Sequence, residues 1–258
     1  MIVANMATYP PREDAMLAAV RSLAAQVDVL NIVLNEYREV PAELGVFPNV
    51  NPIIPEQDTK DTGKYLPRVG DDDIVFTVDD DIGFPADYVA RTLEQYHGLG
   101  AGPLMAGYHG TLYRPARYLR SDFLRRLIGY QPDYIVNSRR FIPFGDALRD
   151  ATVVDELGTG VSVMRGRDIP PFDYVRDAHL FIDVRVALWC HQKGIARVCL
   201  PREAGWLRPV SHPEGIWQDF TLTNPPQVAR EIRQYAFRAS GRGRRYDPRS
   251  ASASLPES

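Results

Sequence analysis

Cysteine and lysine are both scarce in this sequence. The chain has 258 residues but only two cysteines, Cys190 and Cys199, too few for a disulfide scaffold or a cysteine-rich zinc cluster. Lysine occurs three times and arginine 27 times. The 30 basic and 33 acidic side chains leave a formal charge of -3, without the global basic excess typical of nucleic-acid-binding proteins. We therefore expect no nucleic-acid partner.

Long apolar runs are also missing. No run approaches the roughly 18 residues that a membrane-spanning helix needs. The chain begins with the strand-like residues 2–6 rather than with a basic stretch and a long apolar segment, which predicts no secretory signal. We expect a cytoplasmic protein that reaches a membrane only peripherally, through partners. The apolar fraction of 45% excludes a disordered chain and is enough for one sizeable core.

Apolar, strand-like runs alternate with helical patterns along most of the chain. This alternation predicts an α/β fold, a mixed sheet flanked by helices in a single domain. We expect the domain to cover residues 1–238, and the residues 239–258, rich in Arg, Gly and Ser, to form a disordered tail. The expected strands are 2–6, 27–34, 74–78, 104–107, 153–154, 160–164 and 195–200, and the expected helices are 16–24, 85–96 and 181–189.

The strongest chemical signal is the acidic triplet Asp79-Asp80-Asp81, which follows the apolar run 74–78. In an extended segment residues i and i+2 point to the same side, so Asp79 and Asp81 can project together. Ligands of open α/β sheets bind at the carboxyl ends of strands, and a hard divalent cation relieves the repulsion between adjacent carboxylates. The alternative is a plain acidic turn, such as the nearby triplet 71–73.

Two other chemistries begin with similar patterns. Phosphatases with an aspartate nucleophile also carry Asp-x-Asp after a buried strand, but here Ile82-Gly83-Phe84-Pro85 follows the triplet, which weakens that interpretation. Dinucleotide binding requires a glycine-rich turn after the first strand, and no Gly-x-Gly-x-x-Gly is present there.

A set of motifs in a fixed order covers most of residues 1–220. They are residues 1–6, Leu34-Asn-Glu36, Asn51-Pro-x-Ile54-Pro55, Asp61-x-Gly63-Lys64, Asp79-Asp80-Asp81-Ile82, His109-Gly110, Leu157-Gly-Thr-Gly160, Phe181-x-Asp183-Val-Arg185, Pro201-Arg202-Glu203 and Trp206-Leu207-Arg208. With these motifs the chain resembles the GT-A glycosyltransferases. More narrowly, it is similar to the α-N-acetylglucosaminyltransferase subunit of bacterial heparosan capsule synthases. The segments 114–150 and 239–258 match poorly.

The resemblance implies a GT-A (Rossmann-like) fold and a retaining, metal-dependent glycosyltransferase. The donor would be UDP-GlcNAc, the cofactor Mn²⁺ or Mg²⁺, and the acceptor the glucuronic-acid end of a heparosan-type polysaccharide, joined by an α1,4 linkage in capsule biosynthesis. A glucuronosyltransferase partner subunit would add the other sugar. The alternatives are a transferase of a different UDP-sugar and a non-catalytic, nucleotide-sugar-binding subunit of a synthase complex.

The metal ligands expected on this basis are Asp81, with Asp79 beside it, and His212, because GT-A enzymes sometimes carry a further ligand near the C-terminus. A metal that bridges both phosphates offsets the charge of the leaving UDP. The residues expected to contact the nucleotide sugar lie after strands or in glycine-containing loops: Thr8, Tyr9, Arg12, Asn35, Asp61, Lys64, Asp79, Asp80, His109 and Gly160.

Asp183 and Arg208 are the expected catalytic residues. A carboxylate in the apolar helix 181–189 is costly without a partner. Asp183 therefore faces the acceptor and the sugar, pairs with Arg185 or caps the helix. Arg208 lies in a segment rich in Pro, Gly and Ser and could bind the diphosphate with both arms of its guanidinium. The eight arginines in residues 114–150 suit an acidic acceptor, a partner subunit or a solvated loop.

Overall fold

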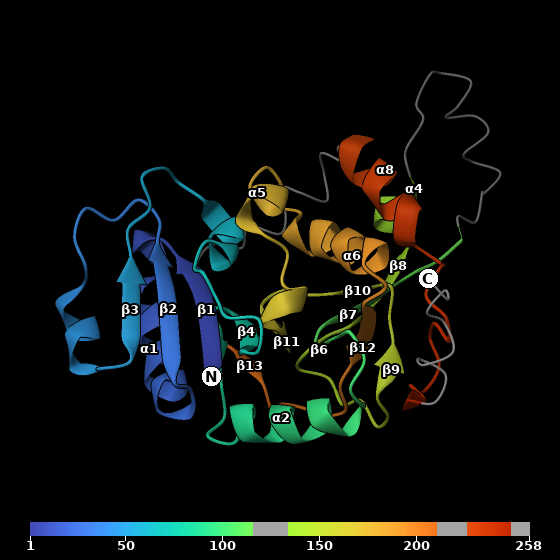
Figure 1. Ribbon diagram of the computed structural model, residues 1–258, viewed down its shortest axis with the longest axis horizontal. Helices are drawn as coiled ribbons and strands as arrows, with labels where there is room; N and C mark the ends of the chain where they lie inside the picture. The colour runs from blue at the N-terminus through green and yellow to red at the C-terminus, as the bar shows by residue number, and fades with distance from the viewer. Residues whose placement is uncertain (116–133, 211–225, 249–258) are drawn as a thin grey trace.

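The computed structural model describes residues 1–115, 134–210 and 226–248, and the statements below concern those ranges. They form an α/β fold with a large mixed sheet flanked by helices (Figure 1), which confirms the predicted fold class. The described part of the main sheet has eight strands, in this order: β3 (Val50–Ile53), β2 (Val29–Leu34), β1 (Ile2–Thr8), β4 (Ile74–Asp79), β11 (Val161–Arg165), β6 (Leu104–Gly107), β12 (Ala196–Cys199) and β9 (Thr152–Val153).

The first four strands of this order are parallel, and β11 is antiparallel to both of its neighbours. Strand β1 is buried along most of its length, with Val3 to Met6 at most 3% exposed, because helices cover both faces of the sheet. A three-stranded sheet has the order β10 (Glu156–Leu157), β7 (Gly110–Tyr113) and β8 (Arg139–Ile142). A two-stranded sheet pairs β13 (Arg208–Pro209) with β5 (Ile82–Gly83).

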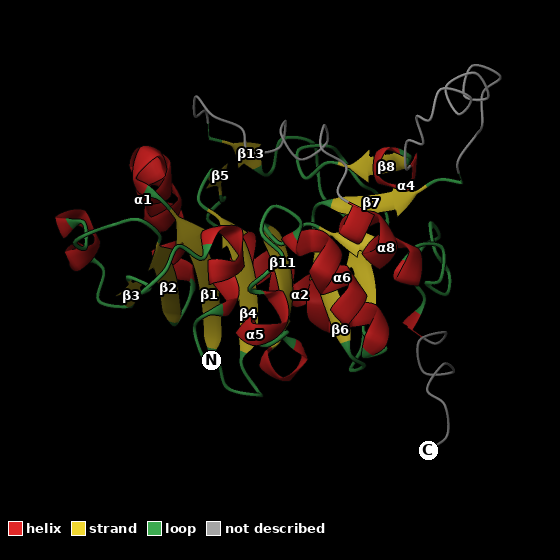
Figure 2. Cartoon of the chain, turned by 90° about the horizontal axis from the view of Figure 1, so that it is seen from above, coloured by secondary structure: helices red, strands yellow, loops and turns green. Residues whose placement is uncertain are grey.

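Helices pack on the two faces of the main sheet and form two cores. Helices α1 (Glu13–Leu23) and α2 (Tyr88–Gly98) bury Met16, Val20 and Tyr88 on one face. Helices α5 (Phe172–Val175) and α6 (Ile182–Gln192) belong to the core of the opposite face. Helix α8 (Pro226–Tyr235) packs on α6 and on the short α4 (Tyr134–Asn137), so it lies outside α6 (Figure 2). None of the helices in the described ranges has the length and apolar character of a membrane span.

Two of the differences from the expectations lie at the edges of the main sheet. Strand β3 lies within the proline-rich segment 41–55, where no strand was expected; Pro52 is tolerated because β3 is the edge strand of the sheet. The expectation of a disordered tail is wrong for residues 239–248. Gly243 and Tyr246 donate backbone hydrogen bonds to Val153 and Ala151, so this segment covers the β9 edge, which would otherwise be open to pairing with another chain.

Arg242 anchors this C-terminal segment through a buried carboxylate. The Asp155 side chain is fully buried, and the Arg242 Nε lies 2.6 Å from its Oδ2. The Asp155 carboxylate also accepts backbone hydrogen bonds from Tyr113, at 2.8 Å, and Phe237, at 3.1 Å. One ion pair therefore joins β7, the end of α8 and the segment that covers β9.

We expect Arg242→Ala to lower the free energy of unfolding by about 3 kcal/mol, because it leaves a buried carboxylate without its counter-ion. The matched control is Arg244→Ala, two residues away on an exposed side chain, for which we expect a change within about 0.5 kcal/mol. Urea denaturation measures both values; equal effects of the two substitutions would contradict the anchoring role.

Candidate functional site

The candidate site lies where the parallel strands β1, β2 and β4 end. The register pairs Ala7 with Asp79 and Thr8 with Leu34, so the residues that follow β1, β2 and β4 share one edge of the sheet. Thr8, Asn35 and the acidic triplet all lie at this edge. The structure therefore brings together the strand-end residues that the sequence analysis singled out.

Asp79, the last residue of β4, faces a buried lysine. Lys64 lies in the short 3₁₀ helix η4 (Lys60–Tyr65) and is 3% exposed, and its ammonium donates to the Asp79 Oδ1. Burial alone would lower the pKa of Lys64, but the negative charges of Asp79, Asp183 and Asp61 outweigh it, so the pKa is raised. Lys64 therefore stays protonated at neutral pH.

Gly160 allows Asp79 to take this position. The Gly160 carbonyl accepts a hydrogen bond of 3.0 Å from the backbone N–H of Asp79. A Cβ atom on residue 160 would overlap the Asp79 carboxylate. The absence of a side chain at residue 160 thus matters because the backbone there touches the Asp79 carboxylate.

Arg12 holds the other two carboxylates of the triplet. Its Nη1 lies 2.8 Å from the Asp80 Oδ1 and 3.3 Å from the Asp81 Oδ2. The Asp80 side chain is only 3% exposed, whereas those of Asp79 and Asp81 are 40% and 25% exposed. Burial raises the pKa of Asp80 even though Arg12 and Thr8 act in the opposite direction. Asp80 is thus the inward member of the triplet, and Asp79 and Asp81 are the accessible pair.

Asp183 lies in the first turn of α6 and turns toward the site. Its Oδ1 accepts hydrogen bonds of 2.8 Å from both the backbone N–H and the hydroxyl of Thr159, next to Gly160. It also influences the pKa values of Lys64, Asp61 and His109, so its carboxylate lies among them. The alternative partner, Arg185, instead binds Glu231 and Asp177.

The loop that carries Lys64 is fixed by buried hydrogen bonds from Asn35. The Asn35 Nδ2 donates to the Lys60 carbonyl at 3.0 Å, and its Oδ1 accepts from the Thr59 backbone at 2.8 Å. Asp61 in the same loop accepts the Leu180 backbone N–H at 3.1 Å, which joins the loop to the start of α6. Asn35 and Asp61 therefore act on the loop that positions Lys64.

Backbone strain concentrates in these loops. Glu36, Lys60 and Leu180 adopt positive φ angles of 61°, 48° and 69°, and Phe237 is the only other non-glycine residue in the described ranges to do so. Such conformations cost about 1–2 kcal/mol each and persist where the surroundings enforce them. Asn35 and Asp61 supply that enforcement for Lys60 and Leu180.

His109 lies among aromatic rings. Its ring centroid is 6.0 Å from that of Phe141 and 6.1 Å from that of Phe144. Burial lowers its pKa, and the positive charges of Arg202 and Arg139 act in the same direction, against the attraction of Asp183 and Asp79. His109 is therefore neutral at neutral pH and can donate or accept one hydrogen bond.

Thr8, Tyr9, Arg208 and His212 complete the predicted set. Thr8 is 3% exposed, and the Arg12 Cζ lies 5.7 Å from the centre of the Tyr9 ring. Arg208 is exposed, and its Nε donates to the Gly205 carbonyl at 2.9 Å. The backbone of β13 runs beside the triplet, since Val210 donates to the Asp81 carbonyl at 2.7 Å. His212 lies outside the described residues.

Glu156 is a buried carboxylate near the site that the sequence analysis missed. Its Oε2 accepts hydrogen bonds from the Tyr113 hydroxyl at 2.7 Å and the Tyr235 hydroxyl at 2.6 Å. Burial and the charge of Asp183 raise its pKa. The signal was an acidic residue directly before the Leu157-Gly-Thr-Gly160 motif, but its two tyrosine partners are distant in sequence and could not be inferred.

Asp79 and Asp81 are the described residues that fit the expected divalent cation. Mg²⁺ is usually held by one or two carboxylates together with substrate phosphates and waters, and these two accessible carboxylates match that donor set. The described ranges contain no group of three or more His, Cys, Asp or Glu side chains arranged to hold a metal. The remaining ligands would come from the substrate, from water or from residues outside those ranges.

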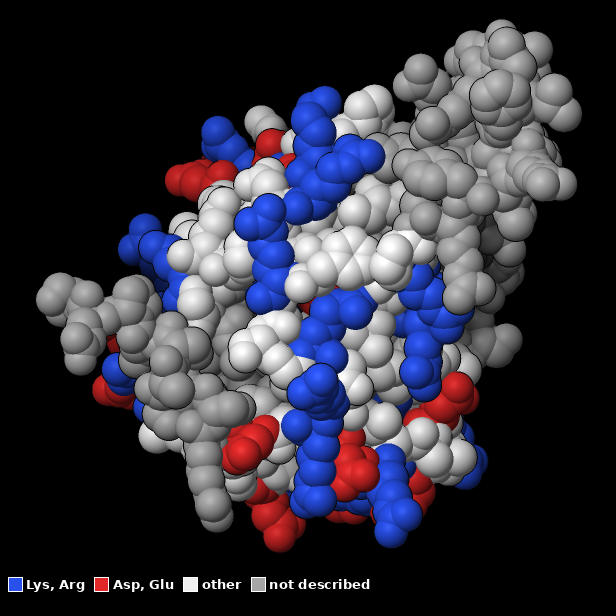
Figure 3. Space-filling view, turned by 90° about the vertical axis from the view of Figure 1, so that its right-hand side faces the viewer, with Lys and Arg blue, Asp and Glu red and all other residues white. Residues whose placement is uncertain are grey.

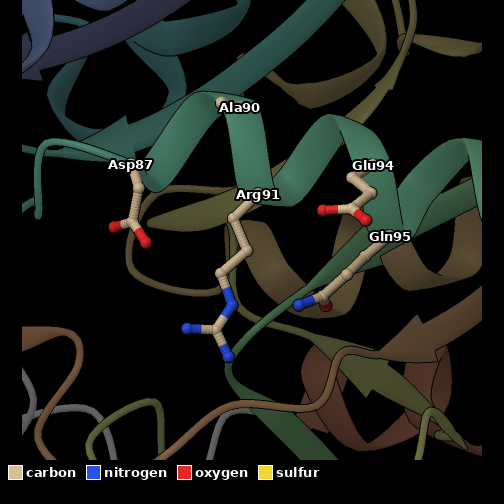
Figure 4. Close-up of a pocket in the computed structure, with 5 residues that line it drawn as sticks. All are labelled: Asp87, Ala90, Arg91, Glu94 and Gln95. Carbon is tan, nitrogen blue, oxygen red and sulfur yellow. The ribbon is translucent and has the colours of Figure 1, made fainter.

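A surface pocket lies elsewhere, along α2. It has a volume of about 640 Å³ and is lined by Asp87, Ala90, Arg91, Glu94 and Gln95, all on or just before α2 (Figure 4). Arg91 also pairs with Glu203 at 2.6 Å and lies over the Trp206 ring. The lining contains none of the strand-end residues, so we assign the chemistry to the carboxylate cluster rather than to this pocket.

Comparisons with known proteins show limited similarity. No protein-family model matches the chain, and no curated protein sequence matches it. Among solved structures, S. aureus TarS matches 82% of this chain at 13% identity, and the chain spans only 37% of the TarS chain. A nucleotidyl transferase from Methanothermobacter thermautotroptrophicus matches 89% of this chain and 98% of its own at 15% identity.

A third match is glucosyl-3-phosphoglycerate synthase from Mycobacterium tuberculosis, in complex with Mn²⁺, UDP-glucose and phosphoglyceric acid. It covers 89% of this chain and 79% of its own at 12% identity. All three matches have a TM-score of 0.48. At these values the likenesses carry no argument about activity, which must be built from the residues of the site.

We expect Gly160→Ala to displace the Asp79 carboxylate and to lower the free energy of unfolding by about 1–3 kcal/mol, because the new methyl group overlaps that carboxylate. Gly98→Ala is the control, since a Cβ atom there meets nothing within 4 Å. Thermal unfolding measures the stabilities. A Gly160→Ala protein as stable as the control would contradict the close approach.

The lowered pKa of His109 predicts a pH dependence of stability. Because the unfolded chain, with an ordinary pKa of 6.5, binds the proton more readily than the fold, the stabilising effect is present above pH 6.5 and is lost as the pH falls through the folded-state pKa. His109→Gln removes this titration. We expect its unfolding midpoint to depend less steeply on pH below 6.5 than that of the native chain, as measured by calorimetry.

Proposed function

We propose that this protein is a metal-dependent, retaining GT-A glycosyltransferase that transfers N-acetylglucosamine from UDP-GlcNAc to a glucuronate-terminated, heparosan-type acceptor through an α1,4 linkage. A separate glucuronosyltransferase subunit would supply the alternating sugar. The observation that carries the proposal is the convergence of Asp79, Lys64 and Asp183 at the carboxyl edge of the sheet. The resemblance of residues 1–220 supports the choice of donor and acceptor.

The charges of this cluster suit a cation and a diphosphate together. Asp61, Asp79 and Asp183 lie near the buried ammonium of Lys64, and Arg12 contacts Asp81. A divalent cation bound at Asp79 and Asp81 would neutralise the diphosphate as its bond to the sugar breaks. Lys64 is already protonated and within contact of Asp79, so its ammonium is placed to attract a phosphate oxygen next to that position.

Asp183 supplies a second carboxylate that can act on the acceptor or on the sugar. The two hydrogen bonds from Thr159 fix one of its oxygens and leave the other to orient an acceptor hydroxyl or to face the positive charge that develops on the sugar ring. In a retaining transfer the departing phosphate oxygen can take the acceptor proton, so Asp183 acts by position and charge rather than as a strong base.

The decisive experiment incubates the protein with a panel of UDP-sugars, Mn²⁺ and a glucuronate-terminated oligosaccharide, followed by mass spectrometry. We expect the acceptor mass to increase by one N-acetylhexosamine with UDP-GlcNAc. Transfer of another sugar would change the assigned donor, and binding of UDP-GlcNAc without turnover would identify a non-catalytic subunit.

Asparagine substitutions test the accessible carboxylates. We expect Asp79→Asn and Asp81→Asn each to lower transfer by about 10²-fold or more, because each removes a charge that the diphosphate–cation complex needs. The matched control is Asp71→Asn, which changes an exposed residue of the acidic triplet 71–73. This variant should retain native activity. Native activity in both site variants would exclude this cluster as the active site.

A further inference from the structure

A positively charged surface lies on α8 and on the segment that follows it. Residues 226–248 contain six arginines and two acidic residues, one of which, Glu231, is buried against Arg185. Figure 3 shows basic side chains gathered into a band across this side of the molecule, with most acidic side chains near its lower end. We call its exposed members the arginine face: Arg230, Arg233, Arg238, Arg244 and Arg245.

An aromatic ring interrupts this face in a strained conformation. Phe237 is 44% exposed and has a φ angle of 68°. Its backbone N–H is held by Asp155, and the Arg242 Cζ lies 4.9 Å from the centre of its ring. The left-handed backbone conformation of Phe237 costs conformational energy. Because the ring is exposed, packing in the core does not offset that cost. The ring is therefore available for contact with another molecule.

Helix α8 packs against the elements that hold Asp183. Tyr235, two residues before Phe237, donates its hydroxyl to Glu156 at 2.6 Å. Glu156 is three residues before Thr159, whose backbone N–H holds Asp183. Arg185, two residues after Asp183, binds Glu231 of α8. The arginine face therefore begins on a helix that adjoins the candidate site.

The composition of the face indicates the kind of ligand. All five of its cations are arginines, whose planar forks match carboxylates in a bidentate geometry. They are spread along α8 and along the segment beside β9 rather than converging on one point, which suits an extended polyanion better than a compact ion. One exposed ring among them suits stacking against the apolar face of a sugar.

We propose that the arginine face and Phe237 bind the body of a carboxylate-bearing polysaccharide whose growing end lies at the candidate site. This inference rests on the proposed function and adds a second contact region for the acceptor. Because the cations act on repeated carboxylates, the gain in affinity grows with the length of the acceptor and falls with salt.

The test compares the binding of a short and a long glucuronate-containing oligosaccharide by fluorescence anisotropy at low and physiological salt. We expect the double charge reversal Arg230→Glu/Arg233→Glu to weaken binding of the long ligand by about tenfold and to leave the short one unchanged. The control is Arg21→Glu/Arg38→Glu, which reverses two exposed arginines on other elements and should bind both ligands as the native protein does.

Phe237→Gly tests the contribution of the ring to binding separately from its contribution to stability. Glycine relieves the positive φ angle, so the unfolding midpoint should stay equal to or above that of the native protein. Affinity for the long ligand should nevertheless fall about tenfold, a loss comparable to that of one aromatic stacking contact. An unchanged affinity in this variant would remove Phe237 from the binding surface.

The outcomes distinguish this inference from the proposed function. If transfer to the short acceptor occurs but the charge reversals do not weaken binding of the long ligand, the arginine face is overturned and the enzyme assignment stands. If the native protein binds duplex DNA or anionic vesicles more tightly than the long oligosaccharide, the face serves a different polyanion and the proposal is wrong. If the native protein transfers no sugar but the charge reversals still weaken binding of the long ligand, the enzyme assignment is overturned and the arginine face stands.

Discussion

The ion pair between Lys64 and Asp79 is the constraint on which the site depends. An ammonium as buried as that of Lys64 would be too costly without compensating charge. Its stability requires the loop 59–65 to approach the end of β4, and the Asn35 hydrogen bonds hold it there. It also requires a glycine at position 160, because the Asp79 carboxylate lies against that backbone. Four separate parts of the chain are thus fitted around one charge contact.

The same contact explains why the acidic triplet does not simply repel itself. Asp79 is compensated by Lys64, and Asp80 and Asp81 share Arg12. The compensation is incomplete, since Asp61 and Asp183 also lie near Lys64. The edge of the sheet therefore keeps a negative surplus that a cation can satisfy, while the buried ammonium gives the same place an attraction for anions. A cation and a phosphate group bound together suit such a place better than either alone.

Much of this arrangement could be predicted from the sequence, because strand ends meet at a sheet edge whenever the strands are parallel. Continuous apolar runs identified β1 and β4, and the triplet at the end of β4 indicated the edge that carries the chemistry. The partners of Arg185 and Glu156 could not be predicted, because Glu231 and Tyr235 lie 46 and 79 residues away. The burial of Asp80 depends on its ion pair with Arg12, which is 68 residues away in the sequence and therefore could not be predicted either. The tail 239–248 was mistaken for disorder because hydrogen bonds to a sheet edge leave no mark on composition.

The pair of Asp155 and Arg242 has a consequence for how the chain is made. The two residues are 87 positions apart, and at ribosomal rates of about 5–20 residues per second the interval between them is roughly 4–17 s. During that interval the nascent chain holds a carboxylate without its counter-ion and an open strand edge at β9. The half built on β1 to β4 can assemble earlier, so this half would stay accessible for longer to chaperones that recognise exposed strands.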